Sequence, residues 1–517
     1  MELLNIWGVL MLTKSKLSSE WILKYYKELE NCGVENHGLL IIKDGETIFE
    51  EYNYPYSVDM PHTLFSVTKS VVSTAVGFAI DEGLFSLDDK IIELFPEYEA
   101  CKGDEWESLT VRSVLTMSSN KKFSFLQDMT GNYMEMFMKA PFRKDKGFLY
   151  SNNDAHVAAA LVHKFSGENL IEYLTPRLFK PLGIEPPFWE TNEIGECIGG
   201  TGCYLKLRDL AKICQCYADG GKYNGEQIIP EFWTKEATKI QVKFNRKDKE
   251  AGYGYLFWIE NGVFSMTGMF GQIISYIPQY NAVVATMNAC IDEGGNERAI
   301  INVLAKAFEN ESTEEWDEKL KEYLENRKLV PKKSREKLNV PTGKAFYMTA
   351  LSDVLAKLMF PASVIPRSLT SSFAKRPKTN FNQVSFDLTD DVFTVKWKEE
   401  GDEVIINCGL DGEPRMSQCE IKGYPYKIWA YAYSESGKIN AVVKPINTLS
   451  TQYITFDFSG NTVKIQIKGT PSFPEFILKN ALSPDFIKKH KPIKLIVTKA
   501  VNLLLSTIER PMKFKIK

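Results

Sequence analysis

The sequence lacks a strong net charge of either sign, and it lacks a long apolar run. Its 63 basic and 66 acidic residues leave a net charge of −3, which gives no reason to expect a nucleic-acid partner. The apolar-leaning N-terminal stretch, residues 1–12, offers only about ten such residues, too few to span a bilayer. It also carries Glu2 where a secretory signal has a base, so we expect a cytoplasmic protein.

Cysteine and histidine are sparse as well. The nine cysteines are odd in number and scattered, which suits a reducing compartment better than a disulfide framework. The five histidines include no H-E-x-x-H motif, and His156 and His163, which would share a helical face, lack a third ligand. Walker A, dinucleotide-glycine and G-x-S-x-G motifs are also missing. We therefore expect no metal and no cofactor, and the nucleophile elbow of an α/β-hydrolase is absent.

Chemistry is indicated instead by Ser66 and Lys69, three residues apart at the start of a predicted amphipathic helix. Positions i and i+3 share a helical face, so the hydroxyl and the amine can touch. The positive end of the helix disfavours an ammonium, so the pKa of the lysine would fall until it can deprotonate the serine. The alternative is an N-cap serine beside a solvated lysine. The spacing alone does not decide, because lysine also follows three residues after Ser118, Ser119, Ser334 and Ser372.

Two later segments add to this pair. Tyr150-Ser151-Asn152 follows a glycine-containing loop and opens a second predicted helix. Val263–Gly268 is typical of a strand, and its terminal glycine lets another backbone lie close alongside. Each segment also has an ordinary explanation. Tyr150 would be an ordinary half-buried tyrosine, one of 23 in the sequence, Asn152 a helix N-cap, and Thr267-Gly268 a plain strand end.

In this order, S-x-x-K, Y-x-N and x-T-G closely resemble the motifs of the class C β-lactamase, DD-peptidase and family VIII esterase superfamily. Further matches lie at Gly38–Gly45, Thr110–Thr116, Gly199–Gly202 and Gly252–Tyr255. The resemblance implies an α+β fold in which helices flank an antiparallel sheet and a helical subdomain is inserted between its first and last strands.

The resemblance also implies roles for the motif residues. Ser66 would be the nucleophile and Lys69 the base or proton relay. Tyr150 would act as acid and base at the leaving group. Asn152 would hold the substrate carbonyl or amide and orient Lys69. A class A β-lactamase is disfavoured, because the second motif has tyrosine in place of S-D-N.

The x-T-G strand would hold the substrate. The backbone N–H groups of Ser66 and of Met269, which follows Thr267 and Gly268, would stabilise the oxyanion. Where β-lactamases and DD-peptidases carry lysine, and many family esterases histidine, this sequence has Met266. A thioether cannot bind a substrate carboxylate as a cation does. The candidate pocket residues nearby are instead aromatic: Trp189, Tyr253, Tyr255, Trp258 and Phe270.

Length and pattern predict two folded domains. Residues 1–315 form the hydrolase domain, and 316–380 a charged linker with a helical pattern at 344–366. In residues 381–480 apolar and polar residues alternate with a period of two, which predicts an antiparallel, barrel-like β module. This module resembles the β-rich C-terminal module of some bacterial family members. Residues 481–517 are a basic amphipathic tail that could dock on a domain; a membrane surface is the less favoured alternative.

Two hypotheses follow for function. The first is a serine hydrolase that forms an acyl-enzyme on Ser66 from a small ester or amide, of esterase or D-amino-peptide amidase type, with weak or no β-lactamase activity. The second is a catalytically silent, penicillin-binding-like protein whose C-terminal β module mediates binding.

Overall fold

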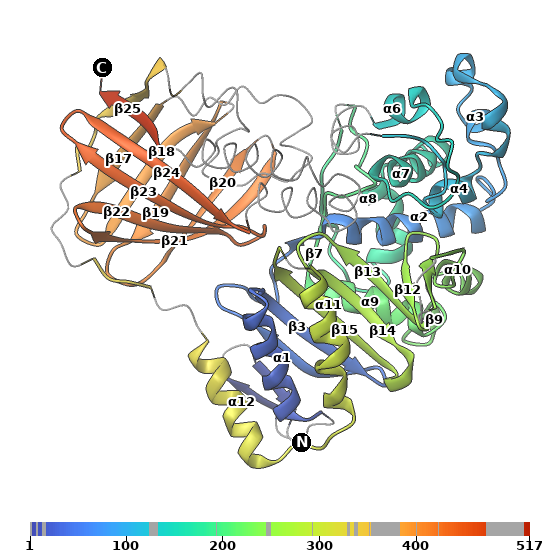
Figure 1. Cartoon of the computed structure of the whole chain (residues 1–517), viewed down its shortest axis with the longest axis horizontal. Coiled ribbons are helices and arrows are strands. Elements are labelled where there is room, and N and C mark those ends of the chain that lie inside the picture. The colour runs from blue at the N-terminus through green and yellow to red at the C-terminus, as the bar shows by residue number, and fades with distance from the viewer. Residues whose placement is uncertain are drawn as a thin grey trace, which may run out of the picture. The chain divides into compact units, whose positions relative to one another are not determined.

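The computed structural model of the chain contains two compact units (Figure 1). The first holds the described residues up to Asn288 and those of 293–326, and the second holds Ala289–Ile291 and the described residues from Arg327 onwards. The structure describes residues 3–6, 9–12, 17–123, 133–192, 194–244, 250–291, 293–327, 331–334, 340–350, 352, 383–399, 401–421, 423–471 and 511–516.

The first unit is built on a ten-stranded sheet with the order β1-β2-β4-β3-β15-β14-β13-β12-β11-β10. The predicted hairpin at 37–52 is β3 and β4, and it turns through Asp44 and Gly45, whose positive φ angles of 51° and 79° suit a tight hairpin turn. The strands are Leu3–Ile6, Val9–Leu12, Glu35–Lys43 and Glu46–Tyr52 (β1 to β4), and Val242–Lys243, Ala251–Tyr253, Trp258–Glu260, Val263–Gly268, Gln272–Ile277 and Ala282–Ala289 (β10 to β15).

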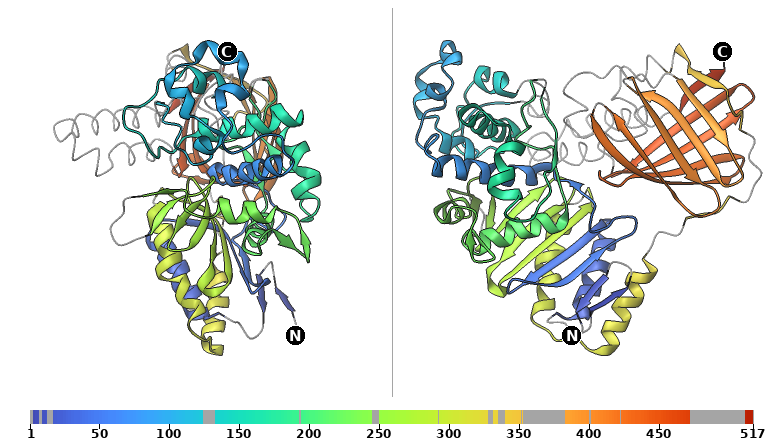
Figure 2. Two further views of the ribbon diagram at one scale, coloured as in Figure 1. Left: turned by 90° about the vertical axis from the view of Figure 1, so that its right-hand side faces the viewer. Right: turned by 180° about the vertical axis from the view of Figure 1, so that it is seen from behind.

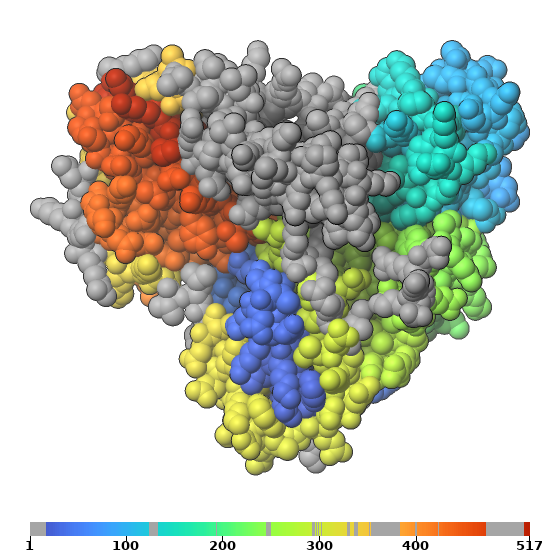
Figure 3. All heavy atoms as spheres, in the orientation of Figure 1, coloured from blue at the N-terminus to red at the C-terminus, as the bar shows by residue number. Residues whose placement is uncertain are grey.

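Helices cover both faces of this sheet. On one face α1 (Ser19–Asn31) packs between α11 (Glu293–Asn302) and α12 (Glu314–Asn326), and the space-filling view shows these helices as the molecular surface there (Figure 3). On the other face α9 (Leu207–Ala218) packs on β3 and β14 (Figure 2). The predicted boundary at residue 315 therefore falls inside α12, a helix of the first unit.

A helical subdomain is inserted between β4 and β10. Its helices are α2 (Thr68–Asp81), α3 (Ile91–Leu94), α4 (Val111–Leu115), α6 (Tyr133–Lys139), α7 (Asn152–Ser166) and α8 (Leu170–Leu174). A small three-stranded sheet, β5-β7-β6, joins the subdomain to the rest: His62–Thr63, Cys203–Leu205 and Phe188–Trp189. The predicted α+β architecture is confirmed.

Helix α2 lies at the centre of the unit, with nearly every side chain buried. Its polar residues are tolerated because they have partners: the hydroxyls of Ser70 and Ser73 donate to the carbonyls of Leu256 and Tyr255 at 2.8 and 2.6 Å. Gly77 is required by close packing, since a Cβ there would lie 2.4 Å from the ring of Trp233.

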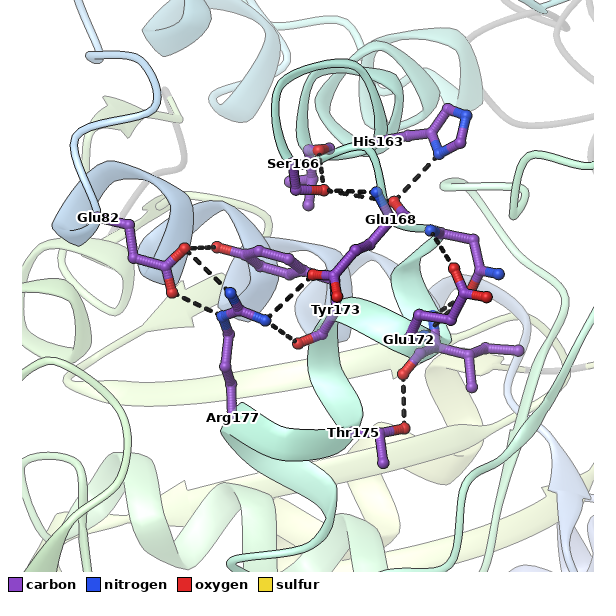
Figure 4. A network of polar contacts seen from close by, with 11 residues as sticks. Glu82, His163, Ser166, Glu168, Glu172, Tyr173, Thr175 and Arg177 are labelled. Carbon is purple, nitrogen blue, oxygen red and sulfur yellow. Dashed lines mark hydrogen bonds and ion pairs between the residues drawn. The ribbon is translucent and has the colours of Figure 1, made fainter.

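Just beyond its C-terminus, α2 is tied to the neighbouring helices by a polar network (Figure 4). Glu82 accepts hydrogen bonds from the Tyr173 hydroxyl at 2.9 Å and from Arg177 Nε at 2.6 Å. Arg177 in turn donates to the main-chain carbonyl of Tyr173 at 2.9 Å, and its guanidinium lies 3.9 Å from the Tyr173 ring centroid. One end of α2 is thus held in place, while the other end carries Lys69.

The second unit is a ten-stranded antiparallel meander that closes on itself into a barrel. Strands β16 to β19 run in sequence, and β16 pairs with the last strand, β25. The sheet closes through one parallel pairing, in which Gly409 of β19 lies opposite Tyr431 of β21. The strands are Ala345–Met348, Gln383–Leu388, Val392–Glu399, Asp402–Gly409, Arg415–Ile421, Tyr424–Glu435, Lys438–Pro445, Thr451–Ser459, Thr462–Thr470 and Met512–Ile516 (β16 to β25).

The barrel confirms the predicted β-rich module, but its first and last strands lie outside 381–480. The helical pattern at 344–366 contains β16, whose four residues pair with β17 and β25 and are too few to show a period of two. The rest of that pattern beyond residue 352, and most of the 481–517 tail, lie outside the described residues; residues 512–516 form β25. Among the described residues, no helix is long and apolar enough to cross a bilayer.

Candidate active site

Ser66 lies in the short 3₁₀ turn Phe65–Val67, which continues directly into α2. Because the chain stays helical from Ser66 to Lys69, the two side chains share a face, and Lys69 Nζ donates a 2.9 Å hydrogen bond to Ser66 Oγ. The lysine is buried, with 1% of its surface exposed, whereas the serine is partly exposed. The pair therefore presents an accessible hydroxyl beside an amine shielded from water.

Lys69 Nζ also donates to two further oxygens. They are Asn152 Oδ1 and the main-chain carbonyl of Gly200, each at 2.7 Å. The nitrogen lies 4.7 Å from the ring centroid of Tyr150. A lysine amine has at most three protons to donate, and these three oxygens fix its direction. The structure thus brings Ser66, Lys69, Tyr150 and Asn152 together.

Tyr150 and Asn152 are positioned by the start of α7. Ser151 is the N-cap: its hydroxyl accepts from the N–H groups of Asn153 and Asp154 at 3.1 and 3.3 Å. The alternative explanation of Asn152 as an N-cap therefore does not hold, and its side chain reaches Lys69 instead. Upstream, Leu149 N donates to the carbonyl of Met117 at 2.8 Å, which fixes the segment that leads into Tyr150.

Sequence reasoning missed the contribution of Gly200. The Gly199–Gly202 segment was noted only as a family match, yet the Gly200 carbonyl is one of the three acceptors of Lys69. A Cβ at Gly200 would lie 2.8 Å from Asn152 Oδ1, and one at Gly199 would lie 2.3 Å from the carbonyl oxygen of Ala155. The signal in the sequence is the pair of adjacent glycines, because only glycine lets the backbone approach a helix this closely.

The end of β13 lies against the turn that carries Ser66. A Cβ at Gly268 would lie 2.3 Å from the carbonyl oxygen of Leu64, two residues before the serine. Thr267, Gly268 and Met269 are partly exposed there. Met266, by contrast, is fully buried in the apolar core. The end of this strand beyond Ser265 pairs with β14 but extends past its pairing with β12, and this end and its terminal turn lie at the site.

Three of the five predicted aromatic neighbours lie close to these residues. The Trp258 ring stacks on Tyr150 with centroids 5.5 Å apart, and Tyr253 packs edge-on to Tyr150 at 6.2 Å. Burial raises the pKa of Tyr253 well above its ordinary value, and the nearby Tyr150 and Asp154 raise it further. Phe270 packs edge-on to Phe65, next to Ser66, at 5.4 Å.

The other two aromatics are core residues. Trp189 is buried and donates its ring N–H to the carbonyl of Ile198 at 3.0 Å. Tyr255 stacks on Trp233 at 5.3 Å and accepts a hydrogen bond from Arg112. Tyr253 and Phe270 are buried as well, so Trp258, which is partly exposed and stacks on Tyr150, is the aromatic residue that borders the site.

Chemically, the cluster contains the parts of a nucleophilic centre. The Ser66 hydroxyl contacts the Lys69 amine, that amine lies over the ring of Tyr150, and the end of β13 lies against the turn that carries Ser66. Among the described residues, no group of three or more His, Cys, Asp and Glu side chains is arranged to hold a metal ion.

Comparison with known proteins places the same half of the chain in one family. The Beta-lactamase family model matches residues 27–289, which include all the motif residues. The chain is 23% identical to the 6-aminohexanoate-dimer hydrolase of Paenarthrobacter ureafaciens over 288 residues, which are 49% of this chain and 72% of that protein.

Solved structures that resemble the chain include EstCE1, a hydrolase with promiscuous acyltransferase activity, at 14% identity and a TM-score of 0.46, over 56% of this chain and 99% of EstCE1. A penicillin-binding protein homologue from Caulobacter crescentus has 14% identity and a TM-score of 0.44, over 55% of this chain and 95% of the homologue.

Proposed function

Because this chain belongs to the beta-lactamase family of hydrolases, we propose that it cleaves small esters or amides through an acyl-enzyme formed on Ser66. The observation that carries the proposal is the hydrogen bond of Lys69 Nζ to Ser66 Oγ, made by a buried lysine whose direction is fixed by Asn152 and Gly200. A serine hydroxyl is a poor nucleophile near neutral pH until a base removes its proton.

In the acylation step, the Ser66 proton passes to Lys69 or through it to Tyr150, and Oγ attacks the substrate carbonyl carbon. This step requires Lys69 as a neutral amine, in which Nζ keeps two protons for Asn152 and Gly200 and accepts from the Ser66 hydroxyl in place of donating to it. The burial of Lys69 keeps competing water away. In this proposal Tyr150 protonates the leaving group, and Asn152 orients the lysine and contacts the acyl group. Water then attacks the carbonyl carbon of the acyl-enzyme, the same groups take up its proton, and Ser66 Oγ leaves and is reprotonated.

The negative charge on the carbonyl oxygen needs donors near Ser66. The backbone N–H groups of Ser66 and Met269 are our candidates, since Gly268 lies directly against the Ser66 turn. Such donors typically contribute roughly 3–4 kcal/mol each to lowering the barrier.

The substrate class follows from the residue before Thr267-Gly268. Met266 offers no charge there, so a substrate carboxylate would lose solvation without gaining a cation at this position. Neutral acyl groups suffer no such cost, and Trp258 adds an apolar wall beside Tyr150. The name of the Paenarthrobacter relative, a hydrolase of a 6-aminohexanoate dimer, supports testing amides beside esters.

We also place the protein in the cytoplasm. The nine cysteines are odd in number and scattered along the sequence, which suits a reducing compartment.

The test is a substrate panel of p-nitrophenyl esters of increasing chain length, D-amino acid anilides and nitrocefin, run with wild type and Ser66→Ala. We expect turnover of short-chain esters, weak or absent turnover of nitrocefin, and no turnover by Ser66→Ala. Equal turnover by Ser66→Ala would overturn the proposal. Failure of wild type to turn over any substrate or to react with a fluorophosphonate would favour a silent, penicillin-binding-like protein.

A further inference from the structure

Four buried polar side chains lie beneath the turn that joins β13 to β14. Gln272 on β14, Thr286 and Asn288 on β15, and Asn36 on β3 are each at most 5% exposed. Burying amides and hydroxyls in a sheet interior is costly unless every group finds a partner. The hydrogen-bond partners of these four side chains show what they hold in place.

Two of these side chains hold the turn itself. Gln272 Nε2 donates to the carbonyls of Met269 at 3.3 Å and of Asn288 at 2.8 Å, while its Oε1 accepts from Asn288 N at 3.3 Å. Asn288 Nδ2 donates to the carbonyl of Gly271 at 2.9 Å. Both turn carbonyls that face the interior are therefore held by side-chain amides.

The other two side chains fix the orientation of Asn288. Asn288 Oδ1 accepts from Asn36 Nδ2 at 2.8 Å and lies 3.2 Å from Thr286 Oγ1. Asn36 and Thr286 also reach the carbonyl of Gly38 at 3.2 and 3.1 Å. Because its oxygen faces these donors, the amide of Asn288 must point its nitrogen at Gly271.

The turn has a conformation that its sequence does not favour. Gly268 O accepts from Gly271 N at 3.3 Å, which closes a four-residue turn over Met269 and Phe270. Phe270 has a φ of +66°, as at the third position of a type II turn, where glycine is the usual residue. Such backbone strain persists only where the surrounding structure imposes it, and it gathers at functional sites.

The consequence for the site comes from peptide planarity. Gly268 C=O and Met269 N–H belong to one trans peptide and point in opposite directions. Since Gly268 O points into the turn, toward Gly271, Met269 N–H points out of it, on the strand end that lies against the Ser66 turn.

We propose that Gln272 and Asn288 are positioning residues that hold this turn in its strained form and so aim the Met269 N–H at the oxyanion. The inference rests on the proposed function, in which Met269 is an oxyanion donor. Without the two amides, Phe270 would leave positive φ by a flip of the Met269–Phe270 peptide, and the turn that sets the Met269 N–H would loosen.

The test compares Gln272→Met with Thr286→Val, which removes a hydroxyl from the same network without touching the turn. Each variant is assayed for thermal midpoint and for kcat/KM with a p-nitrophenyl ester and its thionoester, whose sulfur is a weaker hydrogen-bond acceptor. We expect Gln272→Met to lower kcat/KM for the ester by about 10- to 100-fold. In the same variant, the ratio of kcat/KM for the ester to kcat/KM for the thionoester should become smaller. Because Asn36 still donates to Asn288 Oδ1, Thr286→Val should lower the thermal midpoint and should lower both rates by much less than Gln272→Met does.

A rescue separates positioning from general damage. Glycine adopts positive φ without strain, so Phe270→Gly in the Gln272→Met background should restore part of the lost rate. If Gln272→Met does not fold, Gln272→Glu keeps the size and the acceptor while replacing the donor, and the same loss is expected. Equal rates in Gln272→Met (or Gln272→Glu) and Thr286→Val would overturn the positioning role alone. Absence of wild-type turnover would count against the proposed function.

Discussion

Among the described residues, two S-x-x-K segments have lysines that are equally buried, and one of the two forms a serine–lysine contact. Lys69 and Lys121 are each 1% exposed. Lys69 donates to Ser66 Oγ at 2.9 Å, whereas the hydroxyl of Ser118 lies 2.8 Å from Thr116 Oγ1. Neither spacing nor burial therefore distinguishes a candidate nucleophile from an ordinary serine.

The backbone makes the difference. Residues 66–69 are helical, so the fourth residue returns to the face of the first. Residues 118–121 follow α4 as an irregular segment, with positive φ at Met117 (53°) and Asn120 (59°). Such angles break the helical repeat, and the serine and the lysine diverge.

The surroundings of the two amines differ as well. Lys121 Nζ lies 3.7 Å from the Trp106 ring centroid and 3.9 Å from that of Phe142, and it donates to the carbonyl of Ala140 at 3.0 Å. Burial lowers its pKa to about 7, against smaller opposing effects that include the nearby Asp154. Lys121 therefore holds loops together, while Lys69 is aimed at a hydroxyl.

The largest expected effect comes from a comparison of two variants, in which either Lys69 or Lys121 is replaced by methionine. Lys69→Met should lower the rate of Ser66 acylation by at least about 10²–10⁴-fold, because the proton acceptor is lost. Lys121→Met should leave that rate close to wild type. Pre-steady-state hydrolysis of a p-nitrophenyl ester measures both. Equal losses in the two variants would show that the comparison reflects folding and not chemistry.

The next effect concerns the phenol beside Lys69. Tyr150→Phe should cut kcat by orders of magnitude, and Tyr150→Phe combined with Lys69→Met should be little worse than either alone, since groups in one proton-transfer unit are not additive. Steady-state kcat of the two single variants and the double variant checks this. Strictly additive losses in log kcat would mean that the two groups act in separate steps.

A smaller effect should appear in the pH dependence of stability at Lys121. Its folded pKa of about 7 lies below the ordinary value of 10.5, so between these pH values the unfolded chain keeps a proton that the folded chain has lost. Folding stability then rises with pH in this window by up to about 1.4 kcal/mol per unit, and below pH 7 the burial cost is felt in full.

Lys121→Met removes this term. The variant should therefore gain most over wild type in thermal midpoint near pH 6, and the gain should shrink toward pH 10. A difference between the two midpoints that does not vary with pH would contradict the assignment.

The smallest effect is expected from removing the barrel. The contacts described for both lysines involve only residues 66–200. We therefore predict that a protein ending at Asn326, after α12, folds and reacts with a fluorophosphonate at Ser66 near the wild-type rate. A large loss of rate with an intact thermal transition would show that residues beyond 326 contribute to the site.

Sequence reasoning predicted the α+β fold, which is confirmed, and it selected the motif residues that the structure brings together, because both leave local patterns. Helical and strand periods, a hairpin turn at Asp44-Gly45 and three ordered motifs are readable along the chain. Gly200, Gln272 and Asn288 were not recovered, because their roles depend on contacts across the sheet or between distant loops. Strand β16 was missed for the same reason, since its partners are β17 and β25.

The most direct test of the account is the position of the covalent adduct. Wild type, Lys69→Met and Lys121→Met are treated with a fluorophosphonate, digested and analysed by mass spectrometry. The account predicts a single adduct on Ser66 in wild type and Lys121→Met, and little or none in Lys69→Met. An adduct on Ser118 or Ser151, or active wild-type enzyme that carries no adduct on Ser66, would contradict it.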